Sequence, residues 1–396
     1  MYTSMFRKAM LGDTATLALD FTTGTMPTAV TFTRADSTAR ATFIDASGYV
    51  KTVASAGAAR FDYTDGVAKG LLIEASATNL LKYSAYPDTN WIAFGGYSKS
   101  YITGITSPAN DTSAARVTFG ATGNGLYTNN TLMGYTNTVG DTYTQSAWIR
   151  ATTNTNNLNI RFGDSAVGYS ANIPITTTWT RYSYSYEALS NSGPTLASAS
   201  IGGHTGEFEV WGLQLEKATK PSSYISTTTA ALTRLADDAV IRSTAWTSLY
   251  AQPGAMVVEF YRGAYGAGDR SIMSTDPTAA RHWHLKNANA SATAQIAFSA
   301  GSPVTQTGLT AGLNKVAIAW NAPTPTASFD LCVNGATPTF GGSNVGTTLS
   351  TWLTLGSQST TGVSGTGVWD GYLNNSIKSV KYYTGLTYAE MIAKTT

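Results

Sequence analysis

The stretch Trp179-Thr180-Arg181-Tyr182-Ser183-Tyr184-Ser185-Tyr186 indicates the kind of structure this chain forms, because bulky and small polar side chains alternate along it. A two-residue period places its three tyrosines on one face of an extended strand. Similar alternating runs occupy residues 143–150, 255–261 and 315–320, and Gly, Asn, Asp or Pro separates such runs at roughly ten-residue intervals. This spacing is typical of β-sandwiches and jelly rolls, so we expect an all-β protein.

The composition is that of a folded protein with few charges on its surface. The chain has 396 residues, of which 42% are hydrophobic and only 12% are charged, against about 25% charged in an average protein. This length allows two or three domains with cores of their own. The net charge of +2 and the lack of a Lys/Arg cluster argue against a nucleic-acid partner.

Cysteine content, the N-terminal sequence and hydropathy exclude further classes. Cys332 is the single cysteine, so the chain has neither an internal disulfide framework nor a four-cysteine zinc site. Its place in an alternating run predicts a small, buried strand residue. Arg7 and Lys8 are not followed by the apolar stretch of a secretion signal. No run approaches the roughly 18 apolar residues of a membrane helix, so we expect cytoplasmic synthesis and no membrane insertion.

Two boundaries divide the chain into three expected parts. Helical patterns are scarce, and the best is C-terminal, where Thr387 and Glu390 form a capping box that predicts a helix of one or two turns. The polar run 226–231 has little to bury and marks one boundary, and a second falls near residues 75–80. We predict an N-terminal attachment segment over 1–75, a first sandwich over 76–232, and a second sandwich, closed by the short helix, over 233–396.

The first part resembles a leader found in phage structural proteins. Its pieces follow one another as Phe32-Thr33-Arg34-Ala35-Asp36, Ala59-Arg60-Phe61-Asp62-Tyr63, Gly70-Leu71-Leu72-Ile73-Glu74 and Thr78-Asn79-Leu80-Leu81. This order is similar to that of head-fibre, spike and tail-fibre proteins of tailed phages, and it covers roughly a fifth of the chain. At 75–77 the family more often carries Glu and Arg, which puts one local ion pair in doubt. The resemblance implies a protein of the virion surface, made in the host cytoplasm.

Two later stretches resemble lectin-type sandwiches. Phe208-Glu209-Val210-Trp211-Gly212-Leu213-Gln214-Leu215-Glu216, followed by Pro221-Ser222-Ser223-Tyr224-Ile225, is similar to the last strand and exit of a carbohydrate-binding-module jelly roll. Residues 370–383 and the run 329–335 resemble a concanavalin A-like (laminin-G-like) sandwich. In that run, Asn334-Gly335 is itself a signal for a type I′ turn. The resemblance implies a jelly-roll domain and a concanavalin A-like domain in tandem, with carbohydrate as the ligand.

Sugar binding requires aromatic faces and nearby polar groups rather than a fixed motif. The chain has 22 Tyr and 9 Trp. Tryptophans in strand patterns, such as Trp148 and Trp179, are expected in the core, so aromatic residues of Gly-, Ser- and Asn-rich stretches are the better candidates. Support of the fold or of an oligomer contact is the alternative role for them. We predict glycan contacts at Trp91, Tyr97, Tyr101, Tyr127, Asn129 and Tyr135.

The N-terminus is more apolar than a free tail would be. Met5, Phe6, Met10 and Leu11 either pack beneath the first domain or insert into another virion protein, and we favour the second. The expected partners are therefore capsid or tail proteins, together with the polysaccharide of the host cell surface. A homo-oligomer is expected, as a trimer in a fibre-type appendage or as a pentamer at a capsid vertex.

No complete catalytic motif is present in the sequence. Glu207 and Glu209 share one face of a strand and form the best local pair of carboxylates. Glycosidases need two carboxylates flanking the scissile bond. Concanavalin-type glucanases carry a third acid at the next alternating position, which is Trp211 in this chain. We therefore expect no enzymatic activity.

Metal binding is the other chemistry considered. His282 and His284 could hold a metal as an i, i+2 pair, with cross-strand packing as the alternative. The oxygen-rich stretches 110–112 and 154–157, and Asp269, allow a structural Ca²⁺ but define no ligand set. The metal ligands are thus unknown, and no cofactor is required.

Three functions remain open at this point. The first is a virion structural appendage, a head spike or fibre or a tail fibre, that binds host surface glycans without cleaving them. The second is a purely architectural capsid decoration or spike-base protein, because sandwich domains also serve for packing. The third is a polysaccharide depolymerase, against which the missing third acid argues.

Overall fold

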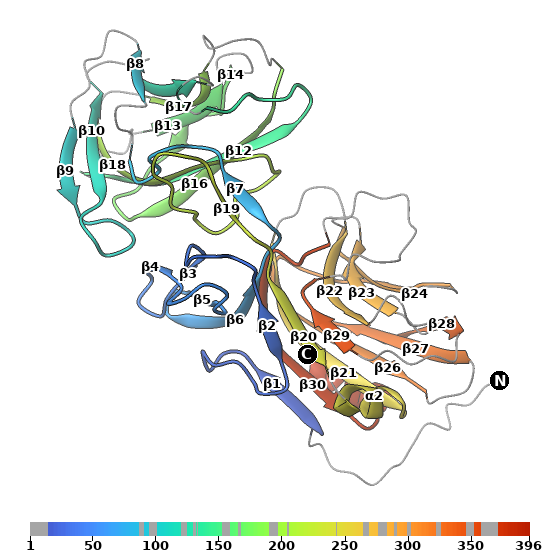
Figure 1. Ribbon diagram of the computed structural model, residues 1–396. Coiled ribbons are helices and arrows are strands. Elements are labelled where there is room, and N and C mark those ends of the chain that lie inside the picture. The colour runs from blue at the N-terminus through green and yellow to red at the C-terminus, as the bar shows by residue number, and fades with distance from the viewer. Residues whose placement is uncertain are drawn as a thin grey trace.

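A computed structural model shows two lobes, each of them a β-sandwich (Figure 1). We call the lobe formed by residues 77–232 the inserted sandwich. We call the other lobe, formed by residues 15–75 together with residues 233–396, the composite sandwich. The structure describes residues 15–86, 91–94, 101–119, 125–129, 132, 134–152, 159–164, 168–189, 197–203, 206–242, 244–263, 269–275, 283–288, 291–298, 302–321, 326–345, 352–357 and 371–396.

Two antiparallel sheets face each other in the composite sandwich. The β21 sheet has the strand order β28 (Thr339–Val345), β27 (Thr326–Val333), β26 (Gly312–Trp320), β21 (Gly254–Arg262), β30 (Asn375–Tyr383), β6 (Val67–Ile73), β5 (Phe61–Thr64), with β1 (Leu17–Asp20) also on β30. The β22 sheet has the order β2 (Thr31–Thr33), β20 (Asp238–Arg242), β29 (Trp352–Leu355), β22 (Arg270–Thr275), β23 (Trp283–Asn287), β24 (Thr293–Phe298), β25 (Val304–Thr307).

Residues 15–75 of the leader are part of this lobe, which corrects the expectation of a separate attachment segment for this part of 1–75. Strand β1 pairs Leu17 with Tyr382, and β6 pairs Ile73 with Asn375. The side chain of Phe21 lies in the same core, fully buried. Pairing between residues more than three hundred positions apart leaves no local pattern, and the sequence therefore did not predict it. The second sandwich is thus formed by both ends of the described chain.

One hydrophobic core fills the space between the two composite sheets. Aromatic side chains dominate it, and the leader, the centre and the C-terminal strands all contribute. Its largest buried members include Phe21, Trp246, Phe260, Trp283, Trp320, Phe329 and Tyr382.

The inserted sandwich also consists of two antiparallel sheets. The β12 sheet has the order β16 (Thr180–Glu187), β12 (Thr142–Ala151), β18 (Gly206–Glu216), β10 (Ala114–Phe119), β9 (Tyr101–Ile105). The β13 sheet has the order β14 (Gly168–Tyr169), β13 (Asn159–Asp164), β17 (Ala197–Gly203), β11 (Gly125–Asn129), β8 (Ile92–Phe94), with β15 (Ile173–Pro174) on β13. Its core includes Trp91, Tyr143, Phe162 and Phe208. The expectation of an all-β sandwich architecture is confirmed.

The chain enters and leaves the inserted sandwich along one ribbon. Strand β7 (Ala77–Asn79) pairs with β19 (Leu232–Arg234) in an antiparallel register that places Ala77 opposite Arg234. A second small ribbon, β3 (Thr42–Ile44) with β4 (Val50–Thr52), projects from the leader toward the inserted sandwich (Figure 1). The two lobes are therefore joined by paired backbone and not by a single extended linker.

The C-terminal helix forms as predicted. Helix α3 (Tyr388–Thr395) has Thr387 as its N-cap. The Thr387 side chain accepts a hydrogen bond from the backbone N–H of Glu390, and the Glu390 side chain accepts one from the backbone N–H of Thr387, which completes the capping box. Met391 on this helix packs on the outer face of the β21 sheet, against Val257 and the buried thiol of Cys332. The predicted Asn334-Gly335 turn is also present, with φ of 46° and 75° at the two residues.

A second helix, α2 (Thr244–Tyr250), was not predicted. Its Trp246 and Tyr250 stack with ring centroids 5.5 Å apart, and both lie in the core of the composite sandwich. Aromatic residues four positions apart share one helix face, and this was the available signal. It was missed because seven residues are too few for a clear helical period.

Six charged side chains form a buried cluster where the two lobes meet, which we call the junction cluster. Arg60 lies at its centre and donates hydrogen bonds to Glu74, at 2.6 Å, and to Asp237. Arg34 bonds the other oxygen of Asp237 at 2.9 Å. Charges balance, since three guanidinium groups face three carboxylates. Its members are Arg34, Asp36, Arg60, Glu74, Arg234 and Asp237.

Glu74 also links the junction cluster to the inserted sandwich. Both its oxygens accept hydrogen bonds from Ser223, from the backbone N–H at 2.8 Å and from the hydroxyl at 2.7 Å. Burial would raise the pKa of Glu74, but Arg234, Arg60 and these hydrogen bonds outweigh it and lower the pKa to about 2. The ionised form of Glu74 therefore stabilises the fold.

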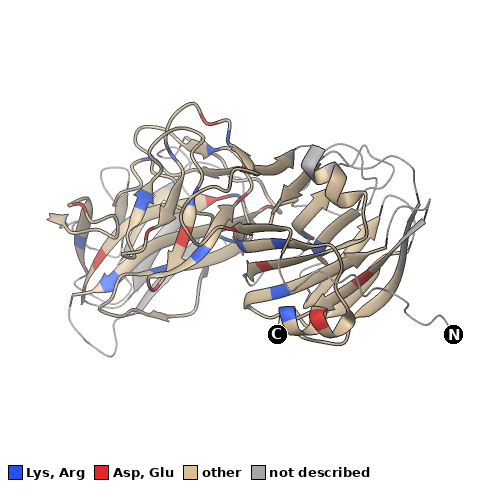
Figure 2. Cartoon of the chain, turned by 90° about the horizontal axis from the view of Figure 1, so that it is seen from below, with Lys and Arg blue, Asp and Glu red and all other residues tan. Residues whose placement is uncertain are grey.

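Charged residues elsewhere are sparse and mixed in sign. Figure 2 shows blue and red residues scattered over both lobes, without a large patch of one sign. In the described part of the chain, no helix is long and apolar enough to cross a membrane.

We predict that Arg60→Ala strongly destabilises the protein. The substitution leaves Glu74 and Asp237 buried without their central cation, and breaking a buried ion pair costs about 3–5 kcal/mol. Urea denaturation measures this loss. The matched control is Lys378→Ala, which removes a one-third-exposed partner of Glu259 and should cost at most about 1 kcal/mol. Equal losses for the two variants would contradict a structural role of the cluster.

Acid should weaken the fold through Glu74. Its pKa falls from 4.5 to about 2 on folding, so its contribution is complete above pH 4.5 and is lost as the pH drops through 2. The expected loss is about 3 kcal/mol, from 1.36 kcal/mol per pKa unit. Glu74→Gln lacks this contribution. We expect the gap in unfolding free energy between the two proteins to shrink between pH 5 and pH 2, and a constant gap would refute this origin.

Candidate functional site

The outer face of the β12 sheet carries polar and aromatic side chains that could meet a ligand. Along β18, Phe208 and Val210 point into the core of the inserted sandwich. Alternation therefore directs Glu207, Glu209 and Trp211 to the outer face. The neighbouring strands β10, β12 and β16 present their own outward residues beside them.

The leader covers one half of this face. Trp148, Trp211 and Tyr224 form a cluster there, with ring centroids 4.6–5.9 Å apart, and Val50 of the β3–β4 ribbon packs on it. A cavity of about 360 Å³ remains beside the cluster, and Arg181 lines it. The Arg181 guanidinium lies 4.5 Å from the centroid of the Trp148 ring. This half of the face joins the two lobes.

The other half of the face is open and carries four side chains in a row, which we call the Arg–Glu row. Arg116, Glu209 and Arg150 occupy directly paired positions on β10, β18 and β12. Arg116 Nη2 donates to Glu209 Oε1 at 2.7 Å, and Arg150 Nε donates to Oε2 at 2.6 Å. The row ends at Trp179, whose ring centroid lies 4.7 Å from the Arg150 guanidinium carbon and which is partly buried against the cluster of Trp148, Trp211 and Tyr224.

The Arg–Glu row holds unused donors in a fixed geometry. Within the described residues, Nη1 of Arg116 and both terminal nitrogens of Arg150 have no hydrogen-bond partner, while each arginine side chain is 31% exposed. Guanidinium groups bind hydroxyl and carboxylate oxygens with directional pairs of hydrogen bonds. Glu209 anchors both of them, so their positions do not depend on the ligand. The row can therefore bind a polar, oxygen-rich ligand.

Both carboxylates of the expected acid pair are used in this structure. Glu209 is 4% exposed, and both its oxygens accept hydrogen bonds from arginine side chains. Glu207 is exposed and accepts a hydrogen bond from Thr118 at 3.3 Å. A glycosidase needs one carboxyl group to donate a proton and the other to attack or activate water. Glu209 has no free oxygen for either step.

Trp91 does not lie where a sugar contact requires it. The expectation placed it in a surface loop, but it is 2% exposed and lies in the core of the inserted sandwich. A large apolar side chain next to β8 gains more from burial than from exposure. Its ring has no open face for stacking, which corrects that candidate.

The structure describes only some of the other residues predicted to contact a glycan. Tyr135 is half-buried, and its hydroxyl shares a 2.9 Å hydrogen bond with that of Tyr143. Tyr101 begins β9, and Tyr127 and Asn129 lie in β11. Tyr97 lies outside the described residues, as do the anchor candidates Met5, Phe6, Met10 and Leu11. Strand β9 belongs to the β12 sheet and β11 to the β13 sheet, and the glycan contacts of all these residues stay predictions.

Sequence reasoning missed the arginines of the row. Arg150 ends an alternating run whose inward positions include Ile149, and Arg116 sits between the buried residues Ala115 and Val117. This parity could have placed each arginine on an outer face. Their meeting at Glu209 depends on the order of strands β10, β18 and β12, which the sequence does not show.

Metal sites find little support in the described part of the chain. It contains no group of three or more His, Cys, Asp or Glu side chains placed to hold an ion. Asp111 instead accepts hydrogen bonds from Ser107 and Ser113 within its own turn. His284 is buried in β23, while His282 and residues 154–157 lie outside the described residues.

Comparison with known proteins gives no family. No family model and no curated protein matches the chain. Similar solved structures include the CBM40 of Ruminococcus gnavus IT-sialidase bound to α2,3-sialyllactose, with 18% identity, 38% of this chain and 87% of that chain covered, and a TM-score of 0.30.

Two further solved structures cover more of the chain. One is the CBM22-1–CBM22-2 tandem domain of Paenibacillus barcinonensis Xyn10C, which is 8% identical. The match covers 78% of the present chain and 96% of the tandem domain, with a TM-score of 0.28. The other is the mouse laminin α1 chain, domains LG4-5, with 7% identity, 78% and 88% coverage, and a TM-score of 0.24. All these TM-scores lie below 0.5, so any argument about function has to come from the residues of this chain.

We predict that Trp91→Ala acts on stability. Truncating a buried Trp costs about 3–5 kcal/mol, and urea denaturation should show a loss of this size. Phe340→Ala is the control, because Phe340 is 69% exposed and a substitution there should cost about 0.5 kcal/mol or less. A small loss at Trp91 would mean that the ring lies on the surface after all.

Proposed function

We propose that the chain is a non-catalytic glycan-binding protein whose inserted sandwich contacts the glycan through the Arg–Glu row. The observation that carries this proposal is the arrangement of Arg116, Glu209 and Arg150 on three adjacent strands, with Trp179 at the end. Sugar recognition combines directional hydrogen bonds to hydroxyl groups with an aromatic surface. Arg116 and Arg150 supply the donors, and Trp179, which is partly buried, supplies the aromatic side chain at the end of the row.

The same contacts support binding without cleavage. Glu209 holds the two arginines in place, and this structural use occupies the oxygens that a catalytic carboxylate would need. A ligand held by fixed donors, without an acid and a nucleophile on opposite sides of the bond, stays intact.

The biological setting we propose is the surface of a virion, as a head spike or fibre or a tail fibre. Support comes from the succession of leader pieces between residues 32 and 84, which resembles that of phage appendage proteins. In this setting the glycan belongs to the host cell surface, the partners are capsid or tail proteins, and the protein forms a homo-oligomer with a trimer favoured.

Binding is tested with the purified full chain on a glycan array, followed by calorimetry on the glycans that bind. We expect Arg150→Ala to weaken binding tenfold or more, because hydrogen bonds from a charged donor are worth about 1.5–3 kcal/mol. Trp179→Ala should weaken it as well. Lys315→Ala, which removes an exposed cation from the composite sandwich, should change nothing.

Two results would contradict the proposal. Unchanged affinity in Arg150→Ala would remove the row from the binding site. Release of shortened oligosaccharides by the wild-type protein, detected by chromatography, would show cleavage and favour a depolymerase.

Attachment is tested separately by deleting residues 1–14. Strand β1 begins at Leu17, and Leu19 and Phe21 are buried in the composite core, so a deletion ending at residue 14 spares the described fold. We expect the free protein to fold while particles lose it from their surface in electron cryomicroscopy. Normal decoration by the truncated chain would exclude this anchor and favour an architectural role of the sandwiches.

A further inference from the structure

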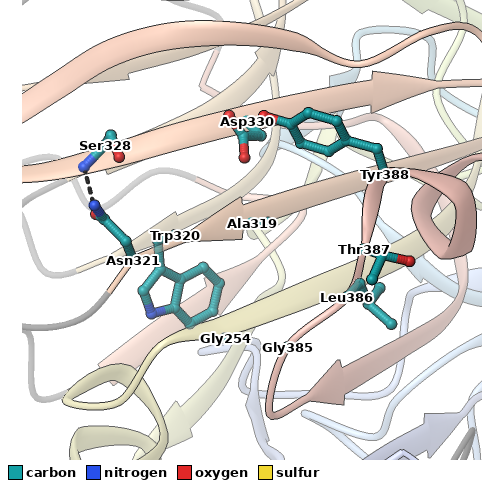
Figure 3. A pocket seen from close by; sticks show the side chains of 10 residues that line it. All are labelled: Gly254, Ala319, Trp320, Asn321, Ser328, Asp330, Gly385, Leu386, Thr387 and Tyr388. Atoms are coloured by element: carbon teal, nitrogen blue, oxygen red, sulfur yellow. Dashed lines mark hydrogen bonds between the residues drawn. The ribbon is translucent and has the colours of Figure 1, made fainter. Parts of the chain in front are cut away.

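A cavity of about 250 Å³ lies in the composite sandwich, between the β26–β27 hairpin and the segment that enters α3 (Figure 3). Asn321, Ser328 and Asp330 line it from the hairpin side, and Leu386 and Tyr388 from the helix side. It is on the other lobe from the Arg–Glu row, so the two sites are independent.

Asp330 brings a carboxylate to this cavity without a balancing cation. In the described part of the chain, no Lys, Arg or His forms an ion pair with it, and its neighbour among the lining residues is the Tyr388 side chain. Burial raises the pKa of Asp330 to about 6, against a smaller lowering by the Tyr388 hydroxyl. A partly buried carboxylate that lacks a counter-charge is stabilised by any cation that enters.

Aromatic rings stand beside this carboxylate. Tyr388 and the 69% exposed Phe340 are stacked, with centroids 6.3 Å apart and planes 7° from parallel, at the edge of the hairpin. Trp320 borders the cavity at the end of β26, but its ring is buried in the composite core and offers no face to a ligand. Ring faces attract ammonium groups and also pack against the C–H face of a sugar.

Polar groups of the hairpin complete the lining. Asn321 Oδ1 accepts from the Ser328 backbone N–H at 2.7 Å, which orients the amide, as Figure 3 shows. Within the described residues, this leaves Asn321 Nδ2 and the Ser328 hydroxyl without hydrogen-bond partners. They can bond the hydroxyl groups of a ligand.

We propose that this cavity binds one unacetylated amino-sugar ring, with its ammonium group on Asp330 and its hydroxyl groups on Asn321 and Ser328. The class follows from the lining: the carboxylate requires a cation, the amide and hydroxyl require oxygen partners, and the aromatic edge suits a ring. The volume also limits the ligand, because drug-sized molecules occupy about 300–1,000 Å³ and this cavity is smaller.

The test is titration calorimetry of the full chain with glucosamine at pH 7. Glucose and N-acetylglucosamine are the matched ligands without charge, and ethanolamine carries the charge without the ring. We expect glucosamine to bind at least tenfold more tightly than each of the three. Asp330→Asn should abolish this preference, and Lys217→Ala, on the inserted sandwich, should leave it intact.

Loss of folding is not expected to account for the effect of Asp330→Asn on binding. The raised pKa of Asp330 means that its ionised form, which predominates at pH 7, lowers the stability of the folded protein relative to the unfolded chain. The neutral amide of Asp330→Asn removes this cost, so its melting temperature should equal or exceed that of the wild type. A lost preference together with an unchanged melting temperature therefore reports on the cavity.

Acid supplies a second readout. Asp330 and Tyr388 are the titratable side chains among the lining residues, and the ammonium of glucosamine stays charged at both pH 5 and pH 7. With a pKa of about 6, the ionised fraction of Asp330 falls about tenfold between pH 7 and pH 5, and the affinity should fall with it.

The proposal is overturned if glucose binds as tightly as glucosamine, if Asp330→Asn keeps the preference, or if affinity does not fall at pH 5. Equal binding of ethanolamine would remove the sugar ring from the proposal. Each of these results leaves the Arg–Glu row untested, so a failure here is distinguishable from a failure of the proposed function.

Discussion

The ion pairs around Arg60 are the interaction on which the two-lobed structure depends. Glu74 ends the leader, Asp237 precedes β20, and Ser223 lies on the exit of the inserted sandwich; Arg60 and its carboxylates bond all three segments. A buried charge has to be paired to be tolerated, so these segments are held in one relative position. The β7–β19 ribbon and the β3–β4 ribbon are the other parts of the junction between the two lobes.

One sheet face of the inserted sandwich serves two purposes because the leader covers only part of it. The covered half buries Trp148 and Trp211 and joins the lobes. The open half keeps Arg116 and Arg150 at the surface, held by Glu209. The row lies on the same strands, β12 and β18, that carry the buried cluster of the junction. A binding site built on strands rather than on loops needs little reorganisation when a ligand binds.

The sequence predicted features that depend on neighbours along the chain. Alternation identified the strands, the spacing of Thr387 and Glu390 identified α3, and Asn334-Gly335 identified a turn. Features that depend on distant partners were missed. The pairing of Leu17 with Tyr382 and the meeting of Arg116, Glu209 and Arg150 are set by strand order. Trp91 was misplaced because polar neighbours in the sequence do not reveal what its ring packs against.

The paired crossing between the lobes has a consequence for how such a protein changes over generations. Ala77 and Arg234 are direct partners, so the inserted sandwich begins and ends at adjacent points in space. A domain whose ends lie together can be exchanged for another without moving the strands of the structure that carries it. Recombination at this ribbon would therefore replace the inserted lobe, with the glycan site proposed for it, in one step while both sheets of the composite sandwich stay intact.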